Sequence, residues 1–387
     1  MENVIVAETS TSFLALSETN ETLSPSLPHS LTPPLPQSSA SSRIGLALFG
    51  VGRWGSHLLR NFLRHPQARV VAVADISLER INGLSQRFDF DFDSDDVILT
   101  TGWQEALRSP NIEAVVIATP AATHYTLIQE ALRRGLHILA EKPLTLDVAE
   151  SFELCHLAAQ QQRQLVIDHT YLFHPAIRRG KEVIQQGTLG ALRYGYAART
   201  HLGPIRQDVD ALWDLAIHDI AIFNHWLSES PVQVQAQGAA WLQSESENPY
   251  PFDRGLSDLV WVKLVYPSGF QAFIHLCWSN PDKQRRLSIA GSQGTLIFDE
   301  MASAPLTLLQ GRLEQTDRYF SPAEQHQQIL NFEAIEPLQQ VCSHFLTCVQ
   351  QNTSSWISPG RLGAELVQIL TALTLSLRQG GRTVDVA

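Results

Sequence analysis

The sequence predicts an α/β protein whose first ordered part is a parallel, doubly wound sheet and whose second part is rich in strands. Three observations predict this fold. Apolar strand-like runs alternate with amphipathic helices from residue 43 onward, and a glycine-rich turn joins the first strand to the first helix. After about residue 190, short strand-like runs are separated by Gly, Pro and Ser turns. With 387 residues, 44% of them hydrophobic, the chain is long enough for two domains.

Residues 1–42 are rich in Ser, Thr and Pro and end in LSPSLPHSLTPPLPQSSASS. This composition buries too little apolar surface to order itself, so we expect a disordered tail. A proline-rich docking motif around residues 32–36 remains the alternative.

Strands and helices alternate regularly from residue 43 to residue 168. The first strand is RIGLALFG, which is followed by the glycine turn VGRWG and by the amphipathic helix SHLLRNFLRH. The next strand is ARVVAVAD, which ends in Asp75, and a helix is expected after it from Leu78 to Arg87. The strands EAVVIATP, LHILAEKP and QLVIDHTYLF follow, with helices in AATHYTLIQEALRRG and SFELCHLAAQQQ between them. This alternation is typical of a parallel doubly wound sheet.

The glycine turn matches the pattern G-x-G-x-x-G through Gly50, Gly52 and Gly55. Its context is a strand before it, a helix after it and Asp75 twenty residues beyond Gly55. Such glycines let a pyrophosphate approach the N–H groups of a helix N-terminus, and the acid can accept from a ribose hydroxyl. The sequence therefore predicts a dinucleotide site. Asp75 favours NAD, because it would repel the 2′-phosphate of NADP; Arg80, five residues on, leaves NADP possible.

The strand HILAEKP ends in Glu141, Lys142 and Pro143. Charged groups are costly to desolvate and proline cannot donate to a sheet, so these residues should lie where the strand leaves its sheet, at the edge where open α/β sheets bind ligands. Pro143 would fix the backbone there, and a cis peptide bond is one way to do so. The plain alternative is a strand-end turn with a solvated Lys–Glu pair.

A second group of polar residues lies in LWDLAIHDIAIFNHWL, which predicts a helix with Asp214, His218 and His225 near one face. A neutral histidine held by a carboxylate is suited to remove the proton of an alcohol. An exposed i,i+4 pair or a core histidine is the alternative. We expect no metal site there, because no third ligand stands at a suitable spacing.

Composition excludes several other classes of function. The net charge is −11 and no Lys- or Arg-rich block is present, so we expect no nucleic-acid partner. No apolar run approaches about 18 residues, and no Lys or Arg precedes Arg43, so we expect neither a membrane span nor a secretory signal. The four cysteines are too sparse for a zinc site or a disulfide framework and fit a reducing cytoplasm.

Aspartates alternate in FDFDFDSDD, at Asp89, Asp91 and Asp93, like the start of a calcium loop. Ser94 and Thr100 occupy the places where such a loop needs Gly and Glu, so we interpret the run as an acidic surface loop.

The segments GVGRWG, VAD, IATPAATH, EKP and DLAIHD resemble, in order and spacing, those of the Gfo/Idh/MocA family of oxidoreductases, named after glucose–fructose oxidoreductase and inositol dehydrogenase. The resemblance implies a Rossmann domain over residues 43–168 and, over 169–387, an α/β domain with a large, mostly antiparallel open sheet. Runs such as RYGYAART, DLVWVKLVY and FQAFIHLCW are consistent with that sheet. It also implies a homodimer or homotetramer formed through the sheet, and a last helix that could pack back on the Rossmann domain.

The resemblance implies an NAD(P)-dependent dehydrogenase that transfers a hydride between a secondary alcohol of a sugar or sugar nucleotide and nicotinamide. His218 would be the general base, assisted by Asp214 and by Lys142, whose ammonium loses its proton more readily in a partly dry site beside a cationic ring. The implied cofactor residues are Gly50, Gly52, Arg53, Trp54, Gly55, Asp75, Ala118, Thr119, Pro120, His124, Glu141 and Lys142.

The stretch ARTHLGPIRQDVDALWDLAIHD looks like the branch of the family that acts at C3 of UDP-N-acetylated hexoses and their uronic acids. His201 and Ile217 depart from that pattern, where Asn and a Pro or Gly are common. Arg199 and Arg206 could meet a carboxylate or diphosphate, or be surface residues. Tyr171 and His169 could reach the same cleft or pack in the core.

Two other classes of function are compatible with parts of this pattern. A reductase of a non-sugar substrate with the same fold need not keep the Asp214–His218 pair. A non-catalytic NAD-binding sensor or scaffold would need neither Lys142 nor His218. The presence of these residues counts against both.

Overall fold

The computed structural model describes residues 43–88, 90–92, 96–243 and 255–386, and these residues belong to one compact unit. The predicted tail, Asp89 and Asp93 of the alternating aspartates, and Ser94 lie outside the described residues.

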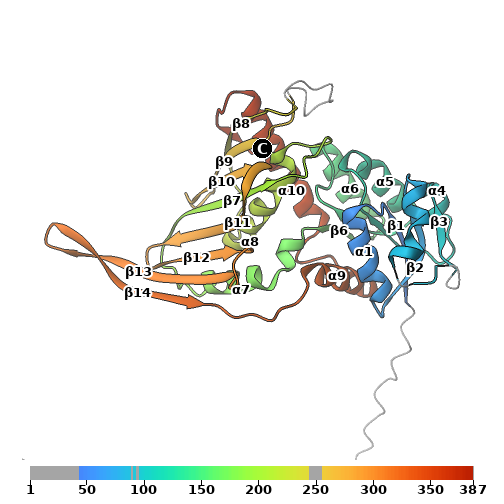
Figure 1. Cartoon of the computed structure of the whole chain (residues 1–387), viewed down its shortest axis with the longest axis horizontal. Helices are drawn as coiled ribbons and strands as arrows, with labels where there is room; N and C mark the ends of the chain where they lie inside the picture. The colour runs from blue at the N-terminus through green and yellow to red at the C-terminus, as the bar shows by residue number, and fades with distance from the viewer. Residues whose placement is uncertain (1–42, 89, 93–95, 244–254, 387) are drawn as a thin grey trace, which may run out of the picture. The chain divides into compact units, whose positions relative to one another are not determined.

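The first sheet has six strands in the order β3-β2-β1-β4-β5-β6, all parallel (Figure 1). This is the predicted doubly wound sheet, and the strand order reverses between β1 and β4, at the place where such sheets bind ligands. The strands are β1 (Ile44–Phe49), β2 (Ala68–Ala74), β3 (Ile98–Thr100), β4 (Ala114–Ile117), β5 (His137–Glu141) and β6 (Leu165–Asp168).

Helices cover the first sheet, and β1 is buried along its whole length, as its uninterrupted apolar run predicts. The helix expected from Leu78 to Arg87 is divided into two short helices, because Gly83 ends the first and caps the second. The helices and short turns of this part are α1 (Arg53–Arg64), α2 (Leu78–Asn82), α3 (Leu84–Arg87), α4 (Trp103–Ala106), η1 (Ala121–Thr123), α5 (His124–Arg133) and α6 (Val148–Gln160).

The second sheet has nine strands in the order β14-β13-β12-β11-β7-β10-β9-β8-β15. All its strand pairs are antiparallel except β7 with β10, so the expected large, mostly antiparallel sheet is confirmed. The strands are β7 (Leu192–Leu202), β8 (Gln233–Ala239), β9 (Leu259–Val265), β10 (Gln271–Cys277), β11 (Ser279–Gly291), β12 (Gly294–Asp299), β13 (Leu306–Thr316), β14 (Tyr319–Ile329) and β15 (Val384–Asp385).

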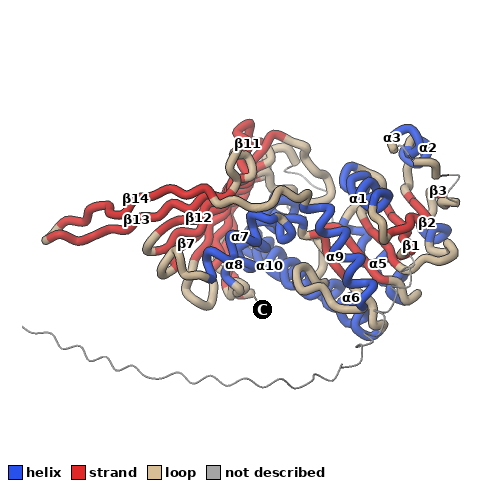
Figure 2. The backbone as a smooth tube through the Cα atoms, turned by 90° about the horizontal axis from the view of Figure 1, so that it is seen from below, coloured by secondary structure: helices blue, strands red, loops and turns tan. Residues whose placement is uncertain are grey.

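Helices α7 (Pro175–Gln185), α8 (Ile217–Leu227) and α10 (Gly360–Arg378) lie along the second sheet (Figure 2). The approach of α8 is close: a Cβ added at Gly195 of β7 would lie 2.5 Å from the ring of Phe223. Glycine at this position therefore allows the helix to pack on the strand.

The C-terminal segment joins the two sheets. Ile167 N donates to Ser358 O at 3.1 Å and Ser358 Oγ donates to Ile167 O at 2.7 Å, so this segment covers edge strand β6. Helix α10 then packs against both α6 and β8, while α9 (Pro337–Gln351) packs against α1. The described helices include none that combines the length and apolarity needed to cross a membrane.

Candidate active site

The glycine turn between β1 and α1 leaves room for a ligand at one glycine and is tightly packed at the others. Gly50 has φ +87°, and a Cβ there would lie 2.6 Å from Ala118 O; at Gly55 it would lie 1.8 Å from Gly50 O. At Gly52, by contrast, a Cβ would meet nothing within 4 Å. Gly52 is also the N-cap of α1, without a side-chain cap, so the first N–H groups of the helix remain available. This cradle fits the pyrophosphate of a dinucleotide.

Asp75, at the end of β2, is tied to the glycine turn. Its Oδ2 accepts from Val51 N at 2.8 Å and its Oδ1 from Ser77 N at 2.9 Å, while Arg80 Nη1 lies 3.5 Å from Oδ1. The contacts from Arg80 Nη1 are long, at 3.5 Å to each carboxylate oxygen, so Asp75 can still accept from a ribose hydroxyl and also fits the cofactor.

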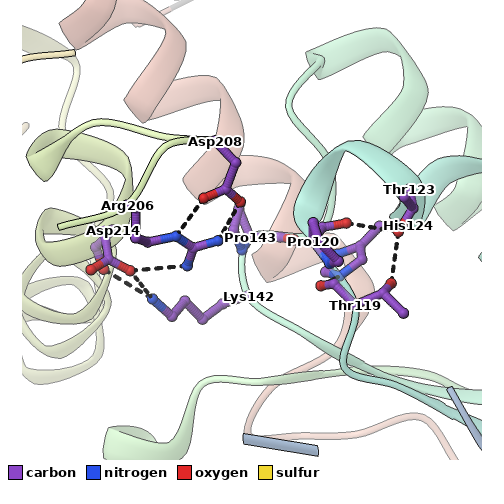
Figure 3. Close-up of polar contacts among 9 residues, drawn as sticks. All are labelled: Thr119, Pro120, Thr123, His124, Lys142, Pro143, Arg206, Asp208 and Asp214. Carbon is purple, nitrogen blue, oxygen red and sulfur yellow. Dashed lines mark hydrogen bonds and ion pairs between the residues drawn. The ribbon is translucent and has the colours of Figure 1, made fainter. Parts of the chain in front are cut away.

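His124, at the start of α5, lies inside the fold and holds two loops (Figure 3). Its ring nitrogens lie 3.0 Å from Thr119 O and 2.9 Å from Pro143 O, and the side chain is fully buried. The Lys142–Pro143 bond is cis, the form that the sequence left open. His124 thus holds the loops after β4 and β5 in position from inside the fold, and its own side chain has no exposed surface.

Lys142, directly after β5, crosses to the second part of the chain (Figure 3). Its Nζ donates to Asp214 Oδ1 at 3.1 Å and to Asp214 O at 2.9 Å, and only 9% of its side chain is exposed. Asp214 Oδ1 also accepts from Arg206 Nη1 at 3.2 Å, and Arg206 pairs with Asp208. Burial by itself would raise the pKa of Asp214, but the charges of Lys142 and Arg206 lower it to about 2. Asp214 therefore stays ionised.

The predicted helix through Asp214 and His218 requires a correction. Residues 212–216 form a π-helical turn, η3 (Leu212–Ala216), and α8 begins only at Ile217. Because i→i+5 bonding widens the turn, residues four apart no longer align as they do on an α-helix. The Asp214 carboxylate meets Lys142 and Arg206, and among the described hydrogen bonds none joins it to His218.

His218 lies partly exposed beside Tyr171, whose ring centroid is 5.1 Å away in an edge-on contact. His218 Nδ1 is buried and has no hydrogen-bond partner within the described part of the chain. Burial, followed by the positive charges of Lys142 and Arg199, holds the pKa of His218 well below its usual value. The imidazole is therefore neutral near pH 7 and has a free nitrogen lone pair. His225 lies further along α8, where the charge of Lys181 acts on it, and does not join this group.

His169, in the loop after β6, is 1% exposed and has no described partner at either ring nitrogen. Burial and the charge of Lys142 lower its pKa to about 3. His169 is thus a second neutral imidazole near Lys142.

Arg199 is a buried residue of β7, 3% exposed, and not the surface residue that the sequence left possible. Its Nε and Nη2 donate to Asp219 at 2.9 and 2.8 Å, and its Nη1 donates to the Tyr171 hydroxyl at 2.9 Å. Tyr171 in turn donates to Glu300 at 2.6 Å. Sequence reasoning selected Arg199 and Tyr171 but missed both acids.

Glu141 and Asp168, the last residues of β5 and β6, are register partners in the sheet. Burial and the neighbouring Asp168 raise the pKa of Glu141 well above its usual value, and burial raises the pKa of Asp168 to about 6. Asp168 Oδ1 accepts from Thr170 Oγ1 at 2.6 Å, while its buried Oδ2 has no described partner. Two adjacent carboxyls in this setting favour a proton held between them.

The described residues contain no group of three or more His, Cys, Asp or Glu side chains able to hold a metal ion. Cys155, Cys277, Cys342 and Cys348 are free thiols.

A parallel sheet with a pyrophosphate cradle, whose Lys142 is held by Asp214 of the second part of the chain, defines a dinucleotide-dependent oxidoreductase. Two family models match this chain: the oxidoreductase family with NAD-binding Rossmann fold, Gfo/Idh/MocA, over residues 44–169, and the Gfo/Idh/MocA C-terminal domain over residues 177–297. The protein belongs to the Gfo/Idh/MocA oxidoreductase family and is an NAD(P)-dependent dehydrogenase.

Relatives with assigned activities act on polyols and sugar nucleotides. The UDP-N-acetylglucosamine 3-dehydrogenase of Acidithiobacillus ferrooxidans is 35% identical over 139 residues, which cover 35% of this chain and 42% of the relative. The inositol 2-dehydrogenase of Rhizobium meliloti is 27% identical over 279 residues, covering 69% and 79%. The crystal structure of an oxidoreductase from Magnetospirillum magnetotacticum MS-1 superimposes with a TM-score of 0.70 at 29% identity, covering 86% of this chain and all of the other.

Proposed function

We propose that the protein oxidises, or forms by reduction, a secondary alcohol of a sugar or sugar nucleotide, with NAD as the partner. One observation carries the proposal: Lys142 extends from the carboxyl end of the dinucleotide-binding sheet and is fixed by Asp214, on the turn that leads directly into α8 and its neutral imidazole, His218. An ammonium and a neutral imidazole so placed match the proton chemistry of an alcohol.

In this mechanism bound NAD supplies the hydride chemistry at its nicotinamide ring. The Lys142 ammonium donates a hydrogen bond to the alcohol oxygen, and the charge it carries stabilises the oxygen as its proton leaves. His218 accepts that proton on a ring nitrogen, which the lowered pKa leaves unprotonated. Asp214 and Arg206 keep Lys142 in position, and Tyr171 packs on the His218 ring.

The substrate and cofactor choices rest on separate observations. Likeness to the UDP-N-acetylglucosamine 3-dehydrogenase supports a UDP-linked amino sugar, and likeness to inositol dehydrogenases supports a cyclic polyol as the second candidate. The buried carboxylate of Asp75 supports NAD over NADP, since a 2′-phosphate beside it would be repelled.

We also propose that the open face of the second sheet pairs with another copy of the chain. Aromatic side chains stand on neighbouring strands of that face: Tyr194 and Tyr196 on β7, Phe273 on β10 and Trp261 on β9 are between 37% and 54% exposed. A contiguous apolar patch of this kind marks an interaction surface.

The test is absorbance at the reduced-nicotinamide band, with purified protein, NAD, and a panel of free sugars, inositols and UDP-sugars. Lys142→Ala and His218→Ala should each abolish turnover while NAD binding survives, and Lys181→Ala on α7 is the matched lysine control. NAD binding with no turnover on the whole panel, and no reduced cofactor carried by the native protein, would favour the sensor or scaffold function instead.

A further inference from the structure

We propose that Arg285 and His201 form a recognition site for an anionic group of the substrate, a carboxylate or a phosphate, on the second sheet beside His218. This inference rests on the proposed function, because the anionic group belongs to the alcohol that His218 deprotonates.

Arg285 of β11 is the register partner of Arg199 on the adjacent antiparallel strand β7. The two guanidinium groups therefore stand on neighbouring strands at the same level of the sheet. Like charges directly opposite each other are destabilising unless each is compensated. We therefore ask which negative charges neutralise the guanidinium groups of Arg199 and Arg285.

Among the described residues, only Arg199 of this pair has an ion-pair partner. Arg199 is neutralised by two hydrogen bonds to Asp219, and the two other arginines nearby are also paired, Arg206 with Asp208 and Arg286 with Asp299. Among the ion pairs of the described residues, none includes Arg285. Burial and the charge of Arg199 lower the pKa of Arg285, and the opposing effects of Tyr171, Glu300 and Asp219 do not fully offset them, as expected for a half-buried cation without an ion-pair partner.

The acceptors that Arg285 does have are neutral. Nη1 donates to Thr200 O at 3.0 Å and to Gln284 O at 2.9 Å, and Nη2 donates to His201 Nδ1 at 2.9 Å. These contacts fix the plane of the guanidinium but leave Nε–H and one Nη2–H without a described partner. Two such parallel donors match the two oxygens of a carboxylate or phosphate.

His201 completes the site with a donor. Because its Nδ1 accepts from Arg285, its proton is assigned to Nε2, which can donate to the same anion. His201 is also one of the two residues that depart from the branch pattern found in the sequence.

A chain of contacts connects the site to the reaction centre. Arg199, the register partner of Arg285, donates to the Tyr171 hydroxyl at 2.9 Å, and the Tyr171 ring lies 5.1 Å from the ring of His218. The lowering of the pKa of His218 by the charge of Arg285 agrees with this placement. An anion held by Arg285 would therefore belong to the reacting sugar unit or to the group directly attached to it.

The experiment measures dissociation constants by calorimetry on NAD-loaded protein for three matched pairs. These are glucuronate with glucose, glucose 6-phosphate with glucose, and UDP-N-acetylglucosaminuronate with UDP-N-acetylglucosamine, so the arms separate carboxylate from phosphate. In at least one pair, we expect the member with the additional carboxylate or phosphate to bind about 10- to 100-fold tighter than the member without it, the range for a charge-assisted hydrogen-bonded contact.

Arg285→Gln should abolish this preference, while Arg285→Lys should keep part of it. Arg286→Gln, the adjacent arginine paired with Asp299, is the matched control and should keep all of it. NAD affinity and the unfolding midpoint check that each variant is folded. Equal affinity within all three pairs, or a preference that survives Arg285→Gln, would overturn the proposal.

The two proposals fail separately. Turnover of a neutral alcohol that requires Lys142, without any anion preference, would retain the dehydrogenase and remove the anion site. An anion preference that depends on Arg285, without turnover of any compound, would retain the site and remove the proposed reaction.

Discussion

The two parts of the chain that meet at Lys142 hold their carboxyl groups in different ways, and we call the part with the first sheet the first wall of the site and the part with the second sheet the second wall. On the wall formed by the first sheet, Glu141 and Asp168 lie side by side at the ends of β5 and β6, and neither has an ion-pair partner among the described residues. On the wall formed by the second sheet, Asp219 lies against Arg199, and Asp214 lies against Arg206 and the incoming Lys142.

This difference shows how one site can hold both protonated and ionised carboxyls. Where burial outweighs the charge of the one nearby cation, Lys142, the neutral form is favoured, and the pKa of Asp168 rises to about 6. Where cations are close, the charged form wins against burial, and the pKa of Asp214 falls to about 2. The Glu141–Asp168 pair of the first wall therefore favours a bound proton, whereas Asp214 of the second wall stays ionised.

Removing the buried carboxylate of the second wall should have the largest effect. Asp219→Asn leaves the guanidinium of Arg199, whose side chain is 4% exposed, without a counter-charge. We expect a loss of about 3–5 kcal/mol in the free energy of unfolding, measured by chemical denaturation. Asp208→Asn, in a pair whose side chains are 31% and 34% exposed, is the control and should cost less than about 1 kcal/mol.

The same interpretation predicts that Arg199→Met with Asp219→Leu recovers part of the loss, because no charge then remains buried. Equal destabilisation by Asp219→Asn and Asp208→Asn would show that the second wall does not depend on buried charge.

The second prediction concerns acid. Because the folded pKa of Asp214 is about 2, below its ordinary 3.8, the carboxylate contributes about 2 kcal/mol of stability above pH 4. That contribution is lost as pH falls through about 2. The unfolding free energies of wild type and Asp214→Asn should therefore differ most near neutral pH and converge toward pH 2. Glu130→Gln, which removes an exposed ion pair between Glu130 and Arg134 of a helix, is the control, and its unfolding free energy should differ little from that of wild type at every pH. Curves that fail to converge would contradict the ion-pair origin of the shift.

The third prediction concerns Asp75, a carboxylate of the first sheet that is held by main-chain N–H groups. Asp75→Asn removes the charge that repels a 2′-phosphate and leaves Arg80 free to attract one. We expect the preference for NAD over NADP, measured as a ratio of dissociation constants, to fall about tenfold, equal to about 1.4 kcal/mol. Arg80→Ala should change the ratio in the opposite direction. An unchanged ratio in Asp75→Asn would remove Asp75 from cofactor selection.

The sequence predicted the first wall better than the second for a physical reason. The glycine turn, Asp75 and Lys142 follow strands of one alternating pattern, and parallel strands bring their carboxyl ends to one edge. That rule could also have paired Asp168 with Glu141, since each ends its strand. The second wall depends on contacts between residues far apart in the chain, such as Lys142 with Asp214 and Tyr171 with Glu300. Their meeting depends on the register of a nine-stranded sheet and on a π-turn, and no local pattern encodes either.

The smallest expected effect is the change in stability with pH that comes from the carboxyl pair of the first wall, because two histidines change the stability in the opposite direction. The folded pKa values of Glu141 and Asp168 are raised, so the folded state holds more protons than the unfolded chain. The pair's contribution to stability is present below about pH 4 and is lost as pH rises through about 6. The buried imidazoles of His169 and His218 have lowered pKa values, and so contribute in the opposite sense over a similar range.

Glu141→Gln isolates the carboxyl pair from the histidines. The amide can donate to Asp168 without ionising, so the part of the loss that comes from Glu141 should disappear, while Asp168 and the histidines still titrate. Between pH 4.5 and 7.5, the free energy of unfolding of the variant should rise relative to that of wild type. Glu130→Gln should instead run parallel to wild type over this range. If Glu141→Gln also runs parallel, the two carboxyls share no proton, and the two walls do not differ in the way that their partners imply.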